Sequence, residues 1–226
     1  MSLSIVFALY PRVTQLDFTA PHEVLWRLPG AQLQLASAAG GRVDADGGLS
    51  FDTQRLADVP RCDVLLVPGG FGVMAAIEDA GFLAQLRRLG EGARYVTSVC
   101  TGSLALGAAG LLKGRRAACH WAWRELLALY PGVTPDAGRV VRDGHVISGG
   151  GVTAGLDMAL TLYAELAGEA AAQAVQLGLE YAPAPPFDCG RPELAPPAVA
   201  DAVRQRLETL GADRRATVGR AAAALA

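Results

Sequence analysis

Length, composition and charge limit the classes of protein to which this chain can belong. It has 226 residues, a formal net charge of −2, 51% hydrophobic and 19% charged residues, which suits one sizeable α/β domain. The basic residues are scattered, so there is no electrostatic footprint for nucleic acid or for an anionic membrane. The four cysteines form no C-x-x-C pair, which argues against a zinc site or a disulfide framework.

In chain order, apolar and β-branched runs alternate with helical patterns. The start, Met1-Ser2-Leu3-Ser4-Ile5, lacks the basic region of a signal peptide and runs into a strand, so we expect a cytoplasmic protein. Strands are expected over residues 3–9, 32–38, 62–67, 95–99 and 115–119, and antiparallel hairpins over 42–51 and 139–148. Helices are expected over residues 82–89, 101–112, 120–129, 153–166 and 169–181. A loop over 14–23 is expected to enter a helix around Pro21.

This alternation of strands and helices predicts a doubly wound α/β fold, with a mostly parallel sheet and helices on both faces. We expect a single domain over residues 1–226. The proline-rich residues 182–187 cannot continue a helix and should form an extended arm. An amphipathic helix in a tail packed on the domain is indicated by the helical spacing of Val199, Val203, Leu207 and Leu210.

Cys100 lies at the centre of eighteen uncharged residues, 95–112, between a buried strand and a helix rich in small residues. Thr101, Gly102 and Ser103 would form the first turn of this helix, where free N–H groups and the helix dipole lower the pKa of a thiol. Because open α/β sheets bind ligands at the carboxyl ends of their strands, we interpret Cys100 as a nucleophile at a strand-to-helix elbow. A buried, inert core thiol is the alternative.

Two other interpretations of this stretch are weaker. A membrane span is disfavoured by its hydroxyl side chains and glycines. A nucleophilic Ser103 is disfavoured because the stretch contains no G-x-S-x-G motif.

Asp17 and the pair Gly69-Gly70 are expected at the same edge of the sheet as Cys100, because each follows the carboxyl end of a predicted strand. Glycine lets the backbone approach a ligand closely, but a tight turn accounts for this pair equally well. Asp17 could also be a turn or cap residue ahead of the helix at Pro21.

Seven stretches of the sequence resemble the ThiJ/PfpI superfamily and, within it, the bacterial isocyanide (isonitrile) hydratases. They are QLDFTAPHEVL at 15–25, VPGGFGV at 67–73, ARYVTSVCTGSLALGAAGLLKGRRA at 93–117, HWAW at 120–123, RVVRDG at 139–144, GGGVTAGLDMALTLYAEL at 149–166 and LEYAPAPPF at 179–187. The elbow cysteine points to the superfamily, and its combination with the Asp17 loop and the proline-rich arm points to the hydratases.

The resemblance implies a catalytic Cys100 as nucleophile and Asp17 as the acid and base beside it. A thiolate would attack the terminal carbon of an isocyanide to give a covalent thioimidate, which water resolves to an N-substituted formamide. Burial would raise the pKa of Asp17 so that it can supply the proton, and the backbone N–H groups of Gly70 and Thr101 would stabilise negative charge. The resemblance also implies a homodimer with the arm near the subunit contact, a small-molecule isocyanide as partner, no metal or cofactor, and no nucleic-acid or membrane partner.

The sequence departs from relatives in ways that bear on activity. Thr101 stands where protease-like members have a histidine, so the Cys–His dyad is absent, and Asp17 stands where deglycase and glyoxalase members have a glutamate. Phe71 is bulkier and Cys119 replaces a threonine of the hydratases, which puts the substrate range in question. His120 could approach the site, but a structural hydrogen-bonding role is the stronger reading.

Non-hydratase functions therefore stay open as alternatives: a cysteine-based redox sensor without turnover, or glyoxalase or deglycase activity. Similar domains also precede DNA-binding regions in transcription regulators, but the residues after the arm are too few for a pair of helix-turn-helix motifs.

Overall fold

Eight strands form the main sheet, in the order β3-β4-β2-β1-β5-β6-β10-β9. The computed structural model describes residues 2–210 and 213–225. Met1, residues 211 and 212, and Ala226, which belong to the expected domain, lie outside the described residues. The strands are β1 (Leu3–Leu9), β2 (Ala31–Ser37), β3 (Gly41–Asp44), β4 (Ser50–Arg55), β5 (Val64–Val67), β6 (Tyr95–Val99), β9 (Val140–Asp143) and β10 (Val146–Gly149).

The centre of this sheet is parallel and buried on both faces. β1 pairs in parallel with β2 and β5, β5 with β6, and β6 with β10, whereas the two edge strands β3 and β9 pair antiparallel. Every residue of β5 and β6 is buried, which is why their sequences are continuously apolar or β-branched and do not alternate. The predicted central strands and both hairpins are confirmed.

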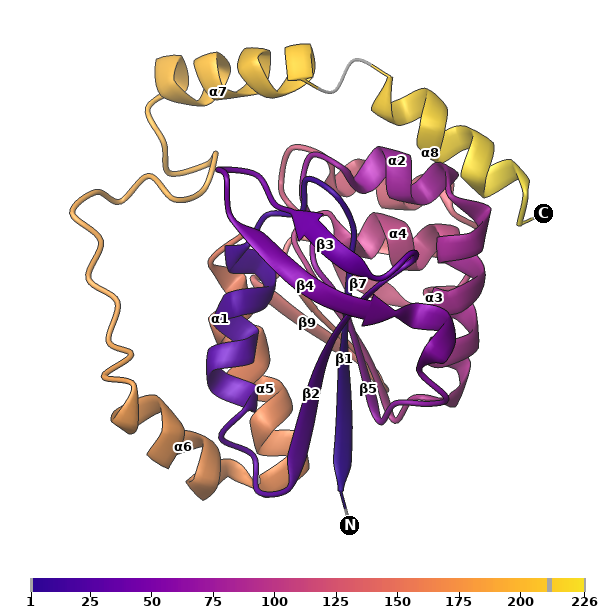
Figure 1. The fold of residues 1–226 in the computed structure, drawn as a ribbon. Helices are drawn as coiled ribbons and strands as arrows, with labels where there is room; N and C mark the ends of the chain where they lie inside the picture. The colour runs from indigo at the N-terminus through magenta and orange to yellow at the C-terminus, as the bar shows by residue number, and fades with distance from the viewer. Residues whose placement is uncertain (1, 211–212, 226) are drawn as a thin grey trace.

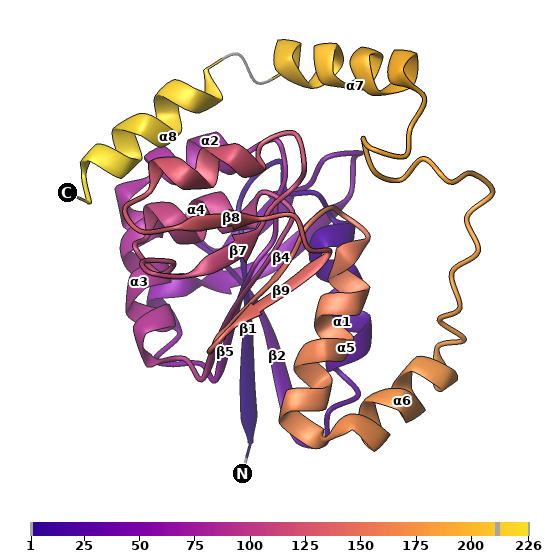
Figure 2. The same ribbon diagram turned by 180° about the vertical axis from the view of Figure 1, so that it is seen from behind.

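Helices cover both faces of the sheet (Figures 1 and 2). They are α1 (Leu16–Leu25), α2 (Val73–Glu78), α3 (Ala80–Gly92), α4 (Gly102–Ala108), α5 (Ala154–Ala167), α6 (Glu169–Gly178), α7 (Pro197–Leu210), α8 (Arg214–Ala223), and the 3₁₀ helices η1 (Leu56–Asp58) and η2 (Arg124–Leu129). α1 and α5 lie together on one face, and α3 and α4 lie on the other (Figure 1). The doubly wound α/β prediction is therefore confirmed.

Two local predictions are wrong. The segment expected as a loop up to Pro21 is already helical from Leu16, with Pro21 inside α1. Residues 120–129 do not form an α-helix: Trp123 has φ −127° and ψ 3°, so the ladder of hydrogen bonds cannot run through it, and only the 3₁₀ helix η2 follows. The strand predicted over 115–119 exists as β7 (Arg116–Ala118), but it pairs with β8 (Thr134–Asp136) in a separate small sheet.

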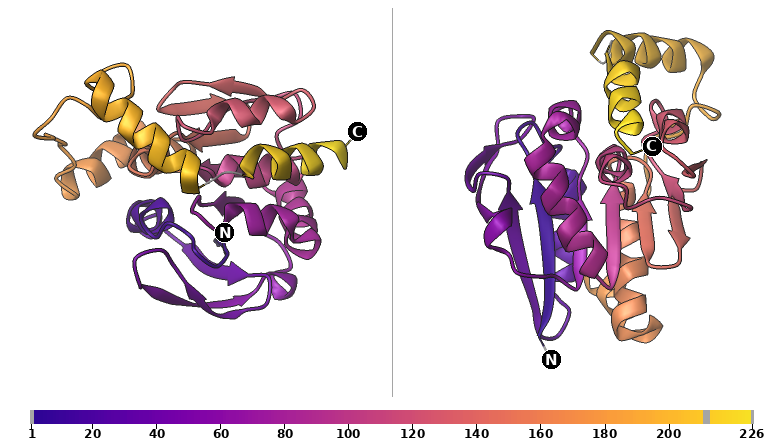
Figure 3. Two further views of the ribbon diagram at one scale, coloured as in Figure 1. Left: turned by 90° about the horizontal axis from the view of Figure 1, so that it is seen from above. Right: turned by 90° about the vertical axis from the view of Figure 1, so that its right-hand side faces the viewer.

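The tail crosses the carboxyl-end edge of the main sheet. α7 and α8 run over this edge, as the view from above shows (Figure 3). α8 contacts α2, α4 and η2, and it is fastened by Thr217, which donates a hydrogen bond to Glu78 at 3.4 Å, and by the ion pair of Arg220 with the same carboxylate. The proline-rich arm has no regular structure and is exposed. The tail therefore lies on the side of the sheet where the strand-end loops meet.

Gly107 offers a test of how closely α4 packs on its neighbours. A Cβ at this position would lie 2.4 and 2.5 Å from ring carbons of buried Tyr130, so we expect Gly107→Ala to lower the free energy of unfolding by about 1–3 kcal/mol through overpacking. The matched control is Gly219→Ala in α8, where nothing lies within 4 Å of the added carbon; it should gain about 0.5–1 kcal/mol from helix propensity. Urea unfolding of the two variants measures both effects, and equal stabilities would contradict the close packing.

Candidate active site

Three loops meet at the carboxyl ends of the neighbouring strands β1, β5 and β6. The loop after β1 leads into α1, whose first turn carries Asp17, the loop after β5 carries Gly69 and Gly70, and β6 is followed directly by Cys100. β1 and β5 are also the strands from which the sheet grows in opposite directions, and such a switch point is where doubly wound folds bind ligands. The structure therefore brings together the residues that the sequence placed at one edge.

Cys100 occupies a strained turn between β6 and α4. Its φ is +58°, a left-handed value that non-glycine residues seldom adopt and that costs free energy. Its backbone N–H donates to the Gly149 carbonyl at 3.0 Å, which extends the pairing of β6 with β10 up to the turn. The side chain keeps 5% exposure. This is the geometry of a nucleophile elbow, and the strain is held by the strands on either side.

Asp17 is fully buried in the first turn of α1. Its Oδ2 accepts a hydrogen bond from the Gly69 N–H at 2.9 Å, and its Oδ1 has no hydrogen-bond partner within the described part of the chain. Burial raises the pKa of this carboxyl group to about 7, against the opposing effects of the Gly69 N–H and the neighbouring Cys100 thiol. A carboxyl group with this pKa exchanges a proton readily near neutrality.

The pKa of Cys100 moves in the direction opposite to the one expected from its place at a helix start. Burial raises it well above the usual thiol value, the nearby Asp17 and Cys119 raise it further, and the backbone N–H of Thr101 lowers it. α4 has seven residues and the thiol is nearly enclosed, so desolvation outweighs the helix terminus. The expectation of a lowered thiol pKa is therefore corrected: the enclosure of Cys100 beside Asp17 raises this pKa and so favours the neutral thiol.

Position 69 has room only for a glycine, because three atoms of the site lie close to its Cα. A Cβ there would lie 2.5 Å from the Thr101 nitrogen, 2.7 Å from its Oγ1 and 2.8 Å from Asp17 Oδ2. Any side chain would thus separate the loop after β5 from the nucleophile turn. Gly69 thus does more than form a tight turn: it lets the backbone approach the carboxylate.

The amide of Gly70 is already engaged, contrary to the expectation that it faces the reacting atom. It donates to Thr101 Oγ1 at 3.1 Å, and its φ of +149° suits glycine, with Arg12 and Thr14 backbone atoms too close for a Cβ. The Thr101 N–H, by contrast, interacts with the Cys100 sulfur. Of the two predicted amides, Thr101 supplies the one on the sulfur, and Gly70 fixes the Thr101 side chain.

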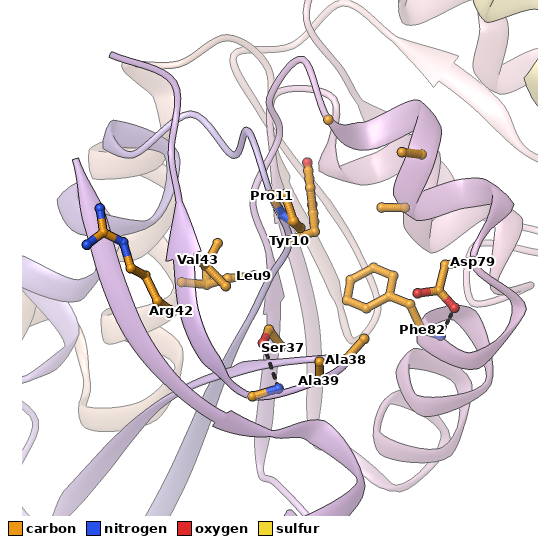
Figure 4. A pocket seen from close by; sticks show the side chains of 14 residues that line it. Leu9, Tyr10, Pro11, Ser37, Ala38, Ala39, Arg42, Val43, Asp79 and Phe82 are labelled. Atoms are coloured by element: carbon orange, nitrogen blue, oxygen red, sulfur yellow. Dashed lines mark hydrogen bonds between the residues drawn. The ribbon is translucent and has the colours of Figure 1, made fainter. Parts of the chain in front are cut away.

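Tyr10 is part of the site and was not singled out from the sequence. Its hydroxyl donates to the Pro68 carbonyl at 2.7 Å, and Asp17 and Cys100 both raise its pKa, in addition to the larger effect of burial. Its ring also borders a hollow of about 370 Å³ between the β2–β3 turn and α2–α3, where it meets Phe82 edge to face (Figure 4). The position of Tyr10 at the very end of β1 is the signal that could have identified it.

The loop after β7 forms another wall. His120 accepts a hydrogen bond from the Ala122 N–H at 3.3 Å and stacks against Trp121 and Trp123. Burial and the charge of Arg214 lower the pKa of His120 to about 4, so it is neutral and holds the turn together. Cys119 is buried, and a hollow of about 290 Å³ adjoins Cys119 and His120.

The structure also bears on Ser103, on the state of the cysteines, and on the possibility of a metal site or a membrane span. Ser103 is fully buried and its hydroxyl donates to the Cys100 carbonyl at 3.3 Å, which is a structural contact. All four cysteines are free. Within residues 2–210 and 213–225, no three His, Cys, Asp or Glu side chains are arranged to hold a metal ion, and no helix there has the length and apolar character of a membrane span. Arg214, at the start of α8, is a further buried residue that the sequence patterns did not indicate.

Comparisons with known proteins agree with this geometry. Residues 3–165 match the model of the DJ-1/PfpI family. The isonitrile hydratase of Pseudomonas putida is 53% identical over 207 residues, which cover 91% of this chain and 90% of that protein. A solved ThiJ/PfpI family protein from Pseudomonas syringae superposes with a TM-score of 0.91 at 40% identity, covering 98% of this chain and 91% of the other.

A more distant structure shares the fold. Drosophila melanogaster DJ-1beta superposes with a TM-score of 0.72 at 26% identity, covering 81% of this chain and 100% of the other. The family expected from the sequence motifs is confirmed, and the chain belongs to the DJ-1/PfpI family.

Proposed function

We propose that this protein hydrates an isocyanide to an N-substituted formamide, with Cys100 as nucleophile and Asp17 as proton carrier. The observation that carries the proposal is the buried pair of Cys100 and Asp17 at a strained elbow, in a chain 53% identical over 91% of its length to an isonitrile hydratase. The reaction needs a nucleophile for the terminal carbon and a proton for the same carbon. The pair provides both.

In the first half of the reaction, one proton moves through Asp17. The Cys100 thiol gives its proton to the ionised Asp17 as the sulfur attacks, and a new bond forms between sulfur and the terminal isocyanide carbon. Asp17 then delivers that proton to the same carbon, which leaves a neutral thioimidate on Cys100. The raised pKa of Asp17, about 7, suits a group that must accept and release a proton in one turnover.

In the second half, water resolves the thioimidate. The oxygen of water adds to the carbon, one water proton ends on the substrate nitrogen, and the carbon–sulfur bond breaks as the carbonyl forms. The remaining water proton returns to the sulfur through Asp17, which restores the starting thiol. The Thr101 N–H stabilises negative charge on the sulfur as it attacks and as it leaves. The scheme balances with thiol, carboxyl group and water alone.

The alternatives draw less support from the site. A redox sensor needs an accessible cysteine with a low pKa, whereas Cys100 is buried and its pKa is raised. Glyoxalase and deglycase relatives have a glutamate where this chain has Asp17, and the described contacts of Asp17 do not favour these activities. We further propose that residues 1–226 act as one domain, in a cytoplasmic homodimer whose subunit contact includes the arm at residues 182–187.

Replacing the two site residues tests the assignment. Cys100→Ala should abolish formation of formamide from an aryl isocyanide, because no covalent intermediate can form. Asp17→Asn should lower kcat by about 10²- to 10⁴-fold, since proton transfer to carbon is lost. Product absorbance and mass spectrometry of the acid-quenched thioimidate measure both effects.

The matched control is Cys189→Ser, which alters an exposed free cysteine and should leave turnover unchanged. A wild-type protein that converts no isocyanide, or a fully active Cys100→Ala variant, would refute the hydratase. Unchanged turnover in Asp17→Asn would instead refute only the proton carrier.

The pH dependence of stability tests the state of Asp17 without any substrate. An unfolded aspartate releases its proton near pH 4 and the folded Asp17 near pH 7, so the folded state binds more protons between these values. The free energy of unfolding contributed by this group is therefore highest below about pH 4 and falls as the pH rises to about 7, by up to about 4 kcal/mol at about 1.4 kcal/mol per pKa unit. Urea unfolding should show this decline in wild type but not in Asp17→Asn.

Asp188→Asn serves as the control for this experiment, because Asp188 lies exposed in the arm region. It should follow the wild-type curve. Parallel curves for wild type and Asp17→Asn would show that Asp17 does not hold a proton at neutral pH.

A further inference from the structure

Arg214 is a buried cation, and two of its side-chain nitrogens have no hydrogen-bond acceptor in the described part of the chain. It is the first residue of α8 and has 4% exposure. Its Nε and Nη1 have no partner among the residues that the structure describes. Burying a charged group without a partner is costly, so a negative charge that forms close to this guanidinium would be stabilised by it.

Aromatic rings hold the guanidinium in place. Its central carbon lies 3.8 Å from the centroid of the Trp123 ring and 5.9 Å from that of Phe71. A cation over the face of a tryptophan is stabilised by the ring quadrupole, more so when water is excluded. α8 is itself anchored by buried Val218 and by the contacts of Thr217 and Arg220 with Glu78. The cation is therefore held in place by packing and by aromatic contact.

The groups around Arg214 belong to the candidate active site. The anionic forms of Cys100, Cys119 and Tyr10 each raise its pKa, whereas burial, the largest effect, and Arg12 lower it. Other charged or titratable groups of this neighbourhood are Asp17 beside Cys100 and Tyr10, Asp46 near Tyr10 and Phe71, His120, whose pKa Arg214 lowers, and Arg124 beside Cys119. Of the two carboxyl groups, Asp46 is paired with Arg12 at 3.5 Å, and Asp17 holds its proton up to about pH 7. Ionisation of a thiol adds negative charge to this neighbourhood.

We propose that Arg214 is the counter-charge of the Cys100 thiolate, supplied to the site by the C-terminal tail. The expected effect of Arg214 on turnover rests on the proposed hydratase function, whereas its expected effect on the ionisation of Cys100 does not. The sulfur carries negative charge when it loses its proton to Asp17 and again when the carbon–sulfur bond breaks. A fixed cation with free N–H groups in a dry site stabilises this charge without reorganisation, and it does so more strongly than it would in water. Arg214 acts on the sulfur electrostatically and takes no part in bond making.

The proposal also gives the tail a function. α8 carries Arg214 at its first residue, and Trp123 belongs to the stretch expected as a helix, which instead forms a turn. That turn brings the Trp123 ring under the guanidinium. The tail and the turn together supply a positive charge to Cys100, a thiol whose other surroundings disfavour ionisation.

The test measures the ionisation of Cys100 directly. Thiolate absorbance in the ultraviolet is followed against pH, and the signal of Cys100 is the difference between each protein and its Cys100→Ala counterpart. Arg214→Met keeps an apolar side chain over Trp123 and removes the charge, so the midpoint should rise by about one to three pH units, the effect of one close opposite charge. Arg214→Lys keeps the charge and should restore most of the wild-type midpoint. Arg215→Met, an exposed neighbour on the same helix, should leave it unchanged.

Each outcome decides the proposal. If Arg214→Met does not fold, as judged by circular dichroism, Arg214→Gln removes the same charge with hydrogen-bond donors retained and should give the same upward shift. An unchanged midpoint in a folded Met or Gln variant would overturn the proposal. So would a shift confined to Cys119, measured as the difference from Cys119→Ser, because Arg214 would then serve the other thiol.

Turnover gives a separate readout. In Arg214→Met we expect a lower kcat with a displaced pH profile, and in Arg215→Met no change. A wild-type protein inactive towards isocyanides would refute the hydratase while the titration still decides the role of Arg214.

Discussion

The site depends on a thiol and a carboxyl group buried together at the end of three parallel strands. Neither Cys100 nor Asp17 is well solvated, so both charged forms are disfavoured and burial raises the pKa of each group. Gly69 makes this proximity possible: its N–H holds one carboxylate oxygen, and its missing Cβ leaves room for the Thr101 backbone. The parallel sheet fixes all three loops, and the strain at Cys100 is a consequence of that rigidity.

Chemically, the arrangement favours a reaction that starts and ends with a neutral thiol. A cysteine held permanently as a thiolate would suit a sensor that meets oxidants in solution, whereas in the proposed reaction the buried thiol beside Asp17 ionises as the substrate reacts. The isocyanide carbon must gain both a bond to sulfur and a proton, and the pair delivers these from one place. This match between a shared proton and the needs of the substrate links the geometry to the proposed hydration.

The C-terminal tail brings a charged residue from the outside of the fold to the candidate site. α8 lies over the strand ends and places Arg214 against Trp123, where its charge acts on the Cys100 sulfur that attacks in the proposed reaction. Phe71, which departs from the hydratase pattern, also borders this cation. The bulky ring at this position packs against the guanidinium, so Phe71 and Arg214 together set the space that is left for a substrate on this side of the site.

The amino-acid sequence by itself determined the sheet and the edge on which the chemistry lies. Continuous apolar runs specify β1, β5 and β6, and in a parallel sheet their ends must meet, so Cys100 and Asp17 converge. Tertiary structure alone decided the thiol pKa, the capture of the Gly70 amide by Thr101, and the approach of Arg214. The reason is physical: strand formation follows from local pattern, whereas desolvation and electrostatics depend on contacts between residues far apart in the chain.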